Sequence, residues 1–254
     1  DELSNGRFNL GLGAGATDFL GWIGIPQERP LAAMRESITV LRRLLAGERV
    51  AYDGAFVKGW TDEAYLRLPV RPRRIPIYLG AMSARMLGLM GEMADGGLPL
   101  LFPPEHLANV MPLVRRGAER AGRDWQTLDL AGCVWCSISD DREAATDALK
   151  EKIAYYGHAL SPLIMRQLGL SARDFEAIRQ AVVVEGDLLK GKALVSEAML
   201  KIGIVGTAAD VIRRLEGLVQ LGARHLSFGP PLGPDPLAAI EVLGQKVIPY
   251  FATR

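Results

Sequence analysis

Short apolar runs that end in glycine alternate along this chain with longer segments whose apolar residues recur at helical spacing. Residues 8–12 lead into Gly13-Ala14-Gly15, residues 75–79 into Gly80-Ala81, and residues 225–228 into Gly229. Such runs are typical of β-strands, and a terminal glycine lets backbone N–H groups approach a ligand closely. The pattern predicts parallel strands with a ligand site at their carboxyl ends.

Helical periodicity fills the intervals between these strands and predicts helices at 30–46, 83–94, 104–121, 140–156, 207–222 and 236–251. The helix at 30–46 has Pro30 in its first turn and Gly47 just past its end, which suits both residues. Ser83 and Asp140 are the expected N-caps of their helices. Thr207 and Asp210 resemble a capping box at the start of another helix.

Strands are expected near residues 7, 75, 98, 128 and 225, with an irregular excursion at 48–74. Residues 158–204 show helical periodicity without a strand, which predicts a helical insertion before the last strand. Strand and helix alternation predicts an α/β fold of the (β/α)8 TIM-barrel type in a single domain, 1–254. Because such a barrel has eight strands, we expect the fold to be N-terminally incomplete by roughly three βα units.

Composition narrows the range of partners. The 254 residues are 49% hydrophobic and carry 30 basic and 29 acidic side chains, for a formal net charge of +1. No basic stripe with aromatics stands out, so nucleic acid is not an expected partner. No stretch reaches the roughly 18 apolar residues of a membrane span, and no signal-like start is present, so we expect a cytoplasmic protein.

Cysteine and histidine positions argue against a metal or redox centre. Cys133 and Cys136 lie three residues apart on the strand expected at 128–139, so their side chains point to opposite faces. Ordinary buried thiols are the expected result. His106, His158 and His225 are too dispersed for a metal site, and no metal is expected.

Several motifs together resemble one family. LGLGAG at 10–15, preceded by residues 1–8, is similar to the fourth-strand entry of luciferase-like flavin monooxygenases and coenzyme F420-dependent reductases. PLAAMRE at 30–36, RRLLAGE at 42–48, IPIYLGA at 75–81 and GEMADG at 91–96 follow in the same order there. Residues 206–207 and GPPLGPD at 229–235 resemble the methylenetetrahydromethanopterin reductase branch. The likeness covers essentially the whole chain.

The resemblance implies a (β/α)8 barrel with a helical insertion before its last strand. It also implies an F420-dependent oxidoreductase that transfers a hydride between the deazaflavin and a carbon substrate, a pterin-bound one-carbon unit being one candidate. In relatives the acidic and polar groups around the reacting face come from the first three units. No position of this sequence corresponds to them, so no catalytic residue is nominated.

Candidate cofactor-binding residues follow from strand ends and from the resemblance. Gly80, Ala81, Met82 and Ser83 join a strand to a helix N-terminus, where free N–H groups and the helix dipole favour an anion. The resemblance places the cofactor phosphate in this region. The alternative is a tight turn with an ordinary N-cap.

The turn at Gly13 and Gly15 either contacts the cofactor or simply needs a positive φ. FMN-dependent relatives often have an arginine in this turn, and Ala14 stands there instead, which favours F420. By the same resemblance Gly97 and Leu98 lie beside the cofactor, although the residues themselves favour the alternative of a packed barrel strand.

Other residues have structural explanations first. Glu92 and Asp95 follow a helix, so salt bridging or capping is the expected role. The segment 229–233 is expected to shape a pocket wall, since its two prolines remove hydrogen-bond donors. The four tryptophans are expected either to line a substrate pocket or to pack in the core or between subunits. They are Trp22, Trp60, Trp125 and Trp135.

Three functions therefore stand as hypotheses. The leading one is an F420-dependent oxidoreductase acting on a small-molecule substrate as a homodimer or higher homo-oligomer. The second is an FMN-dependent luciferase-like monooxygenase of the same fold. The third is a non-catalytic, flavin-binding remnant that lost its first units.

Overall fold

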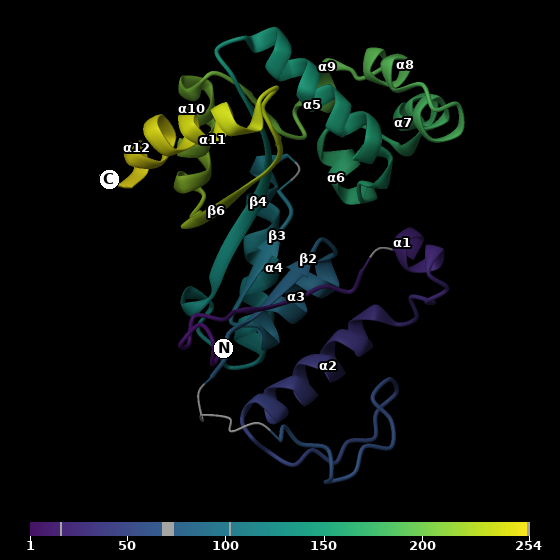
Figure 1. Ribbon diagram of the computed structural model, residues 1–254, viewed down its shortest axis with the longest axis vertical. Helices are drawn as coiled ribbons and strands as arrows, with labels where there is room; N and C mark the ends of the chain where they lie inside the picture. Colours follow the sequence, from purple (N-terminus) through teal and green to yellow (C-terminus); the bar gives the residue numbers. More distant parts are fainter. Residues whose placement is uncertain (16, 68–73, 102, 253–254) are drawn as a thin grey trace. The chain divides into compact units, whose positions relative to one another are not determined.

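The computed structural model describes residues 1–15, 17–67, 74–101 and 103–252 (Figure 1). The chain divides into two compact units. The first comprises Asp1–Pro99 and Val110–Leu130, and the second comprises Leu100–Asn109 and Ala131–Arg254. Both contain parallel strands with helices between them.

The first unit is built on parallel strands β1 (Leu10–Leu12), β2 (Ile77–Ala81) and β3 (Gly96–Pro99). The first residues of β4 (Asp129–Ile138) pair with β3. Strands predicted near 7, 75, 98 and 128 are therefore confirmed, although the first begins at Leu10. The helical elements of the first unit are α1 (Thr17–Trp22), α2 (Pro30–Leu45), α3 (Ala84–Met93), the greater part of α4 (Leu107–Arg120) and the 3-10 turn Trp125–Thr127.

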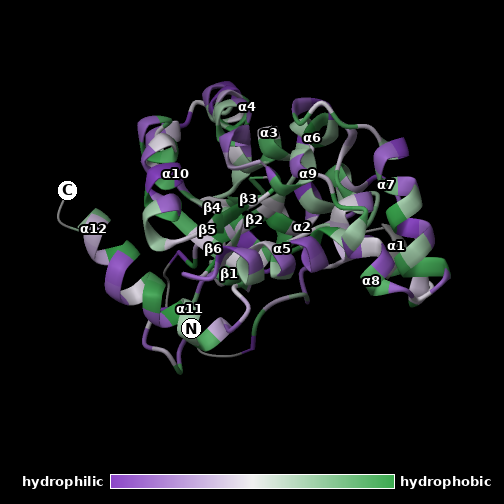
Figure 2. Ribbon diagram, turned by 90° about the horizontal axis from the view of Figure 1, so that it is seen from above, coloured by the Kyte–Doolittle hydropathy of each residue, from purple (hydrophilic) through white to green (hydrophobic). Residues whose placement is uncertain are grey.

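Local chemistry explains where these helices begin and end. Pro30 opens α2, and Gly47 follows it with a φ of 80°. Ser83 caps α3, because its hydroxyl accepts a hydrogen bond from the backbone N–H of Met86. In Figure 2 the helices carry both hydrophobic and hydrophilic residues, as is typical of amphipathic helices. The predicted helices at 30–46 and 83–94 are confirmed.

The excursion after α2 is irregular, as the glycines and prolines predict. Tyr52 and Trp60 form an isolated antiparallel bridge within residues 48–67. The Glu36 carboxylate of α2 accepts hydrogen bonds from the N–H groups of Ala55, Phe56 and Val57. Residues 68–73 of the predicted excursion lie outside the described residues.

Glycines allow α3 and α4 to pack backbone to backbone. A Cβ on Gly91 would overlap the carbonyl oxygen of Val114 and lie 2.8 Å from the N of Ala118. A Cβ on Gly117 would overlap the carbonyl oxygen of Gly88. Neither conflict involves a flexible side chain, so both glycines are required by this helix contact.

The carboxylates near the C-terminal end of α3 form ion pairs. Glu92 pairs with Arg35, and Asp95 pairs with Arg42 at 2.6 Å and Arg74 at 2.5 Å. Asp95 also accepts the N–H of Ile77 at 2.9 Å. Burial alone would raise the pKa of the Asp95 carboxyl, but the Ile77 and Arg42 hydrogen bonds and the two guanidinium charges outweigh it and lower that pKa. The predicted salt-bridging role is confirmed.

Replacing Asp95 by asparagine is expected to lower the free energy of unfolding by about 2 kcal/mol at neutral pH. A carboxyl with a lowered folded-state pKa stabilises the protein above its unfolded-state pKa of about 4 and loses that contribution as the pH falls through the folded value. The difference between wild type and Asp95→Asn should therefore shrink in acid. Urea titrations at neutral and acidic pH measure it, with the exposed Asp62→Asn as control, and an equal difference at both pH values contradicts the assignment.

The second unit contains the rest of β4, which pairs in parallel with β5 (Ile204–Gly206) and β6 (His225–Leu232). The predicted last strand is confirmed. β5 was not predicted. Helix α10 (Ala208–Gln220) begins with the predicted capping box of Thr207 and Asp210. The helix predicted at 236–251 comprises α11 (Pro236–Val242), a π-helical segment Leu243–Val247 and α12 (Ile248–Ala252).

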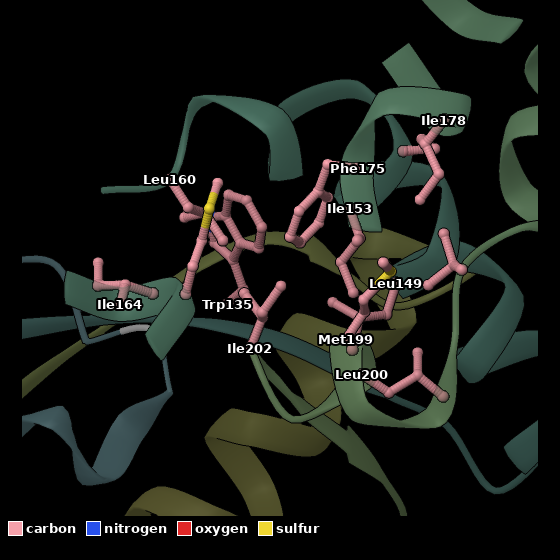
Figure 3. Packing of buried hydrophobic residues seen from close by; sticks show 13 residues of the cluster. Trp135, Leu149, Ile153, Leu160, Ile164, Phe175, Ile178, Met199, Leu200 and Ile202 are labelled. Atoms are coloured by element: carbon pink, nitrogen blue, oxygen red, sulfur yellow. The ribbon is translucent and has the colours of Figure 1, made fainter. Parts of the chain in front are cut away.

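Short helices occupy the region between β4 and β5, as the helical periodicity predicts. They pack with α5 around one hydrophobic cluster that includes Trp135, Phe175 and Ile202 (Figure 3). The cap of α5 is Asp141 and not Asp140 as predicted, because the Asp141 carboxylate accepts the N–H of Ala144. The elements are α5 (Arg142–Tyr156), α6 (Pro162–Gln167), α7 (Ala172–Arg179), α8 (Leu188–Ala193) and α9 (Glu197–Leu200), with 3-10 turns Pro104–His106 and Gly157–Ala159 and a π-helical segment Gln180–Val184.

The helix predicted at 140–156 is confirmed as α5, which shares this cluster with the short helices of the insertion predicted at about 158–204. Cys133 and Cys136 are free thiols on β4, half-buried and buried respectively, as predicted. Within the described part of the chain, no helix is long and apolar enough to cross a membrane.

Candidate functional site

Strand register brings several predicted cofactor residues to one edge of the first unit. Leu12 lies opposite Leu79, so Gly13 follows β1 at the level of Gly80 in β2. Gly80 in turn lies opposite Leu98 of β3, and Ala81 lies opposite Pro99. Because the three strands are parallel, their carboxyl ends meet at this edge. Gly13, Gly80, Ala81 and Leu98 are therefore neighbours.

One face of these strands is almost free of side chains at that edge. A Cβ on Gly11 or Gly13 would meet nothing within 4 Å, and one on Gly80 would meet only the Leu12 carbonyl oxygen, at 3.7 Å. Leu98, opposite Gly80, has 38% of its surface exposed. We call this surface, formed by Gly11, Gly13, Gly80 and Leu98, the glycine face. A flat ring can approach the main chain there, so the residues present fit a flavin-type cofactor.

The N-terminus of α3 adjoins the glycine face directly in sequence. Ala81 is buried, whereas Met82 and Ser83 are exposed between β2 and the helix. The Ser83 hydroxyl satisfies the N–H of Met86 at 3.3 Å, and the ten-residue helix directs its positive dipole end toward this connection. The predicted role of Met82 and Ser83 at an anionic group stays a prediction, supported by this placement.

Gly15 and Gly97 have packing roles that the sequence had left as alternatives. Gly15 has a φ of 72°, and a Cβ there would lie 3.0 Å from Leu20. Gly97 is buried, and a Cβ there would overlap Met90 and lie 2.8 Å from the Leu79 carbonyl oxygen. The predicted cofactor contacts of both glycines stay predictions that involve their main chain.

A tyrosine and a carboxylate on the same strands were missed by the sequence analysis. Tyr78, two residues before Gly80, donates a hydrogen bond from its hydroxyl to Asp129 at 2.6 Å. This bond, together with burial and the negative charge of Asp129, raises the pKa of Tyr78 to about 12. Tyr78 is therefore a neutral donor at neutral pH. The two-residue alternation that places Tyr78 with Gly80 could have indicated it.

The second unit contains the segment predicted to shape a pocket wall. Gly229 of β6 pairs with Trp135 of β4, and the Pro230-Pro231 peptide bond is cis. Trp135 is 8% exposed and belongs to the hydrophobic cluster, which supports the packing alternative for this tryptophan.

A separate cavity of about 950 Å³ lies in the second unit between α5, α9, β5 and α10. Five basic and four acidic side chains line it, and Asp210 pairs with both Arg142 and Arg213. Charges of both signs largely neutralise one another, so the cavity has no electrostatic preference for one class of ligand. In the part of the chain that the structure describes, no group of three or more His, Cys, Asp and Glu side chains could hold a metal ion.

Comparison with known proteins gives this geometry its context. The model of a family described as luciferase-like monooxygenase matches residues 1–225. The chain belongs to this family. It is 33% identical over 253 residues to a 5,10-methylenetetrahydromethanopterin reductase from Archaeoglobus fulgidus, a match that covers 98% of this chain and 75% of the relative.

Solved structures of luciferase-like proteins have the same fold. The coenzyme F420-dependent tetrahydromethanopterin reductase from Methanopyrus kandleri superposes with a TM-score of 0.89 at 30% identity, over 98% of this chain and 76% of that one. An F420-dependent secondary alcohol dehydrogenase in complex with an F420–acetone adduct superposes with a TM-score of 0.73 at 21% identity, over 96% of this chain and 70% of that chain. The predicted α/β fold of the TIM-barrel type is thus confirmed, as is the predicted family.

Proposed function

We propose that this luciferase-like protein is an F420-dependent oxidoreductase that transfers a hydride between F420 and a carbon atom of a small-molecule substrate. The observation that carries the proposal is the glycine face, where Gly13 and Gly80 leave the main chain open beside the N-terminus of α3. Relatives at 33% and 31% identity that are reductases of 5,10-methylenetetrahydromethanopterin support this cofactor and reaction.

Each group of the site has a definite task in this proposal. Gly13 and Gly80 let the ring lie against the backbone, and Leu98 supplies an exposed apolar contact that excludes water. The N-terminus of α3, capped by Ser83, stabilises an anionic group of the ligand. When bound, F420 supplies the deazaflavin carbon that accepts or releases the hydride. The protein contributes binding and orientation.

Binding of F420 is the direct test of the cofactor. We expect the purified protein to bind F420, seen as quenching of cofactor fluorescence on titration, with an affinity at least about tenfold higher than for FMN. FMN is the matched competitor, since the FMN-dependent monooxygenase is the alternative function. Preferential binding of FMN would reverse the assignment, and binding of neither would remove both.

Turnover tests the substrate class. Reduction of 5,10-methylenetetrahydromethanopterin by reduced F420 is the first assay, because two of the relatives reduce this compound. Glucose 6-phosphate is the second, because relatives at 26–28% identity are named as its F420-dependent dehydrogenases. Tight binding of F420 without turnover of any carbon substrate would favour the third hypothesis, a non-catalytic remnant.

A homo-oligomer in the cytoplasm completes the proposal. Large exposed apolar residues of α11 and α12, such as Leu237, Ile240 and Ile248, support contacts with a further copy. Light scattering coupled to gel filtration measures the state directly, and a monomer at micromolar concentration would contradict this part of the proposal.

A further inference from the structure

Lys152 of α5 is held between two aromatic rings in the second unit. Its Nζ lies 3.9 Å from the centroid of the Tyr156 ring and 5.4 Å from that of the Trp135 ring. The two rings meet edge to face, with centroids 6.4 Å apart. We call Lys152, Trp135 and Tyr156 the lysine cage. Such rings fix the direction of an ammonium group, because their faces attract the positive charge.

No carboxylate neutralises Lys152 among the described residues, although the side chain is half-buried. Another lysine of the same helical segment shows the usual arrangement. Lys192, whose side chain is 13% exposed, pairs with Asp147 at 2.5 Å and with Glu151 at 3.7 Å. A partly desolvated ammonium without an acidic partner is uncommon in a folded protein and has donor capacity left for a ligand.

The nearest ionisable neighbour does not supply the missing charge. Burial raises the pKa of the Cys133 thiol, and the proximity of Lys152 only partly opposes this. The thiol therefore keeps its proton at neutral pH. Burial lowers the pKa of Lys152 in turn, and Cys133 opposes that shift. The ammonium accordingly lies beside a neutral thiol and two neutral rings.

At Gly229, β6 carries no side chain next to the lysine cage. β6 runs next to β4, with Ser227 opposite Cys133 and Gly229 opposite Trp135. A Cβ on Gly229 would lie 3.3 Å from Trp135 and 3.5 Å from the Cys133 sulfur. A side chain at 229 would therefore press on the Trp135 ring, which would have to shift by a few tenths of an ångström, whereas glycine leaves the ring in its place. The pocket-wall role predicted for 229–233 agrees with that position.

We propose that Lys152 is an anion-binding residue of the second unit that takes a carboxylate or phosphate group of a small-molecule ligand. The ammonium donates hydrogen bonds to the anionic oxygens, while the faces of Trp135 and Tyr156 hold it in place. This anion site goes beyond the proposed function and does not rest on it, because it is defined by residues of the second unit alone.

Chemical labelling of lysines tests the site without turnover. The full chain is treated with limiting trinitrobenzenesulfonate, with inorganic phosphate, with acetate or with neither, and each lysine is quantified by peptide mass spectrometry. We expect an anion to slow labelling of Lys152 at least about fivefold. Lys150, two residues away on α5 and outside the cage, is the internal control and should label equally in all three samples.

The pattern of protection distinguishes the two anions. Protection by phosphate alone identifies a phosphate site, and protection by both anions identifies a general carboxylate and phosphate site. Equal protection of Lys150 and Lys152 would indicate a general salt effect and overturn the proposal, as would no protection of Lys152 by either anion.

Variants then test the residue itself. Lys152→Met should weaken binding of the protecting anion, measured by isothermal titration calorimetry, about tenfold or more at nearly unchanged thermal stability, and Lys152→Arg should restore much of the loss. Lys150→Met should behave as wild type. A fall in the thermal stability of Lys152→Met with unchanged anion affinity would show a structural role only and overturn the proposal. Failure of the wild type to bind F420 would instead remove the proposed function and leave the labelling result unaffected.

Discussion

Gly80→Val is expected to weaken F420 binding at least about 100-fold while leaving the free energy of unfolding within about 1 kcal/mol of the wild-type value. The reason is the open space beside this residue. A Cβ at position 80 meets only the Leu12 carbonyl oxygen, at an ordinary contact distance of 3.7 Å, and valine suits an extended strand. The protein therefore has room for the valine side chain. That side chain would, however, occupy the space that a ring lying on the glycine face needs.

Fluorescence titration with F420 and urea unfolding of the same preparation measure the two quantities. Gly97→Ala is the matched comparison, one strand away, because its Cβ would overlap Met90 and press on the Leu79 carbonyl oxygen. It should lower stability by about 1–3 kcal/mol. If Gly80→Val binds F420 as tightly as wild type, the ring does not lie on the glycine face.

Gly117→Ala is expected to destabilise the first unit by about 3 kcal/mol or more, a large stability loss for the addition of one methyl group. The added methyl group would overlap the carbonyl oxygen of Gly88 and approach its carbonyl carbon to 2.8 Å. Only a movement of α3 away from α4 relieves this overlap. Since Gly91 faces Val114 and Ala118 in the same contact, no neighbouring space is available to absorb the shift.

Gly217→Ala provides the control for the intrinsic preference of a helix for alanine. Gly217 lies in α10, and a Cβ there would meet nothing within 4 Å, so alanine should stabilise this helix by about 0.5–1 kcal/mol. Thermal and urea unfolding of both variants provide the comparison. A Gly117→Ala variant that is as stable as wild type would show that α3 and α4 are not in backbone contact in solution.

Local signals along the sequence predicted most elements of both units. Helix ends were predictable because Pro30, Gly47, Ser83 and Thr207 satisfy or terminate the backbone within a few residues of themselves. The glycine-terminated strands were predictable for the same reason. They also indicated Gly13 and Gly80 as neighbours, since parallel strands of similar register must end at one edge.

Other features depend on contacts that no short window contains. β5 has only three residues, and its pairing with Cys136, Ser137 and Ile138 of β4 is what makes it a strand. The core that α5 shares with the short helices after it was not predictable either, because it joins residues separated by tens of positions. The Tyr78 and Asp129 hydrogen bond and the lysine cage likewise join distant parts of the chain.

The glycine face has an evolutionary consequence. Recognition through peptide groups depends on main-chain geometry, which a single amino acid exchange seldom changes by small steps. Descendants of this protein would therefore either keep the cofactor or lose it completely. Divergence toward new metabolites would instead proceed through exchangeable side chains outside the glycine face. This arrangement favours the evolution of proteins that retain one redox cofactor and differ in their reactants.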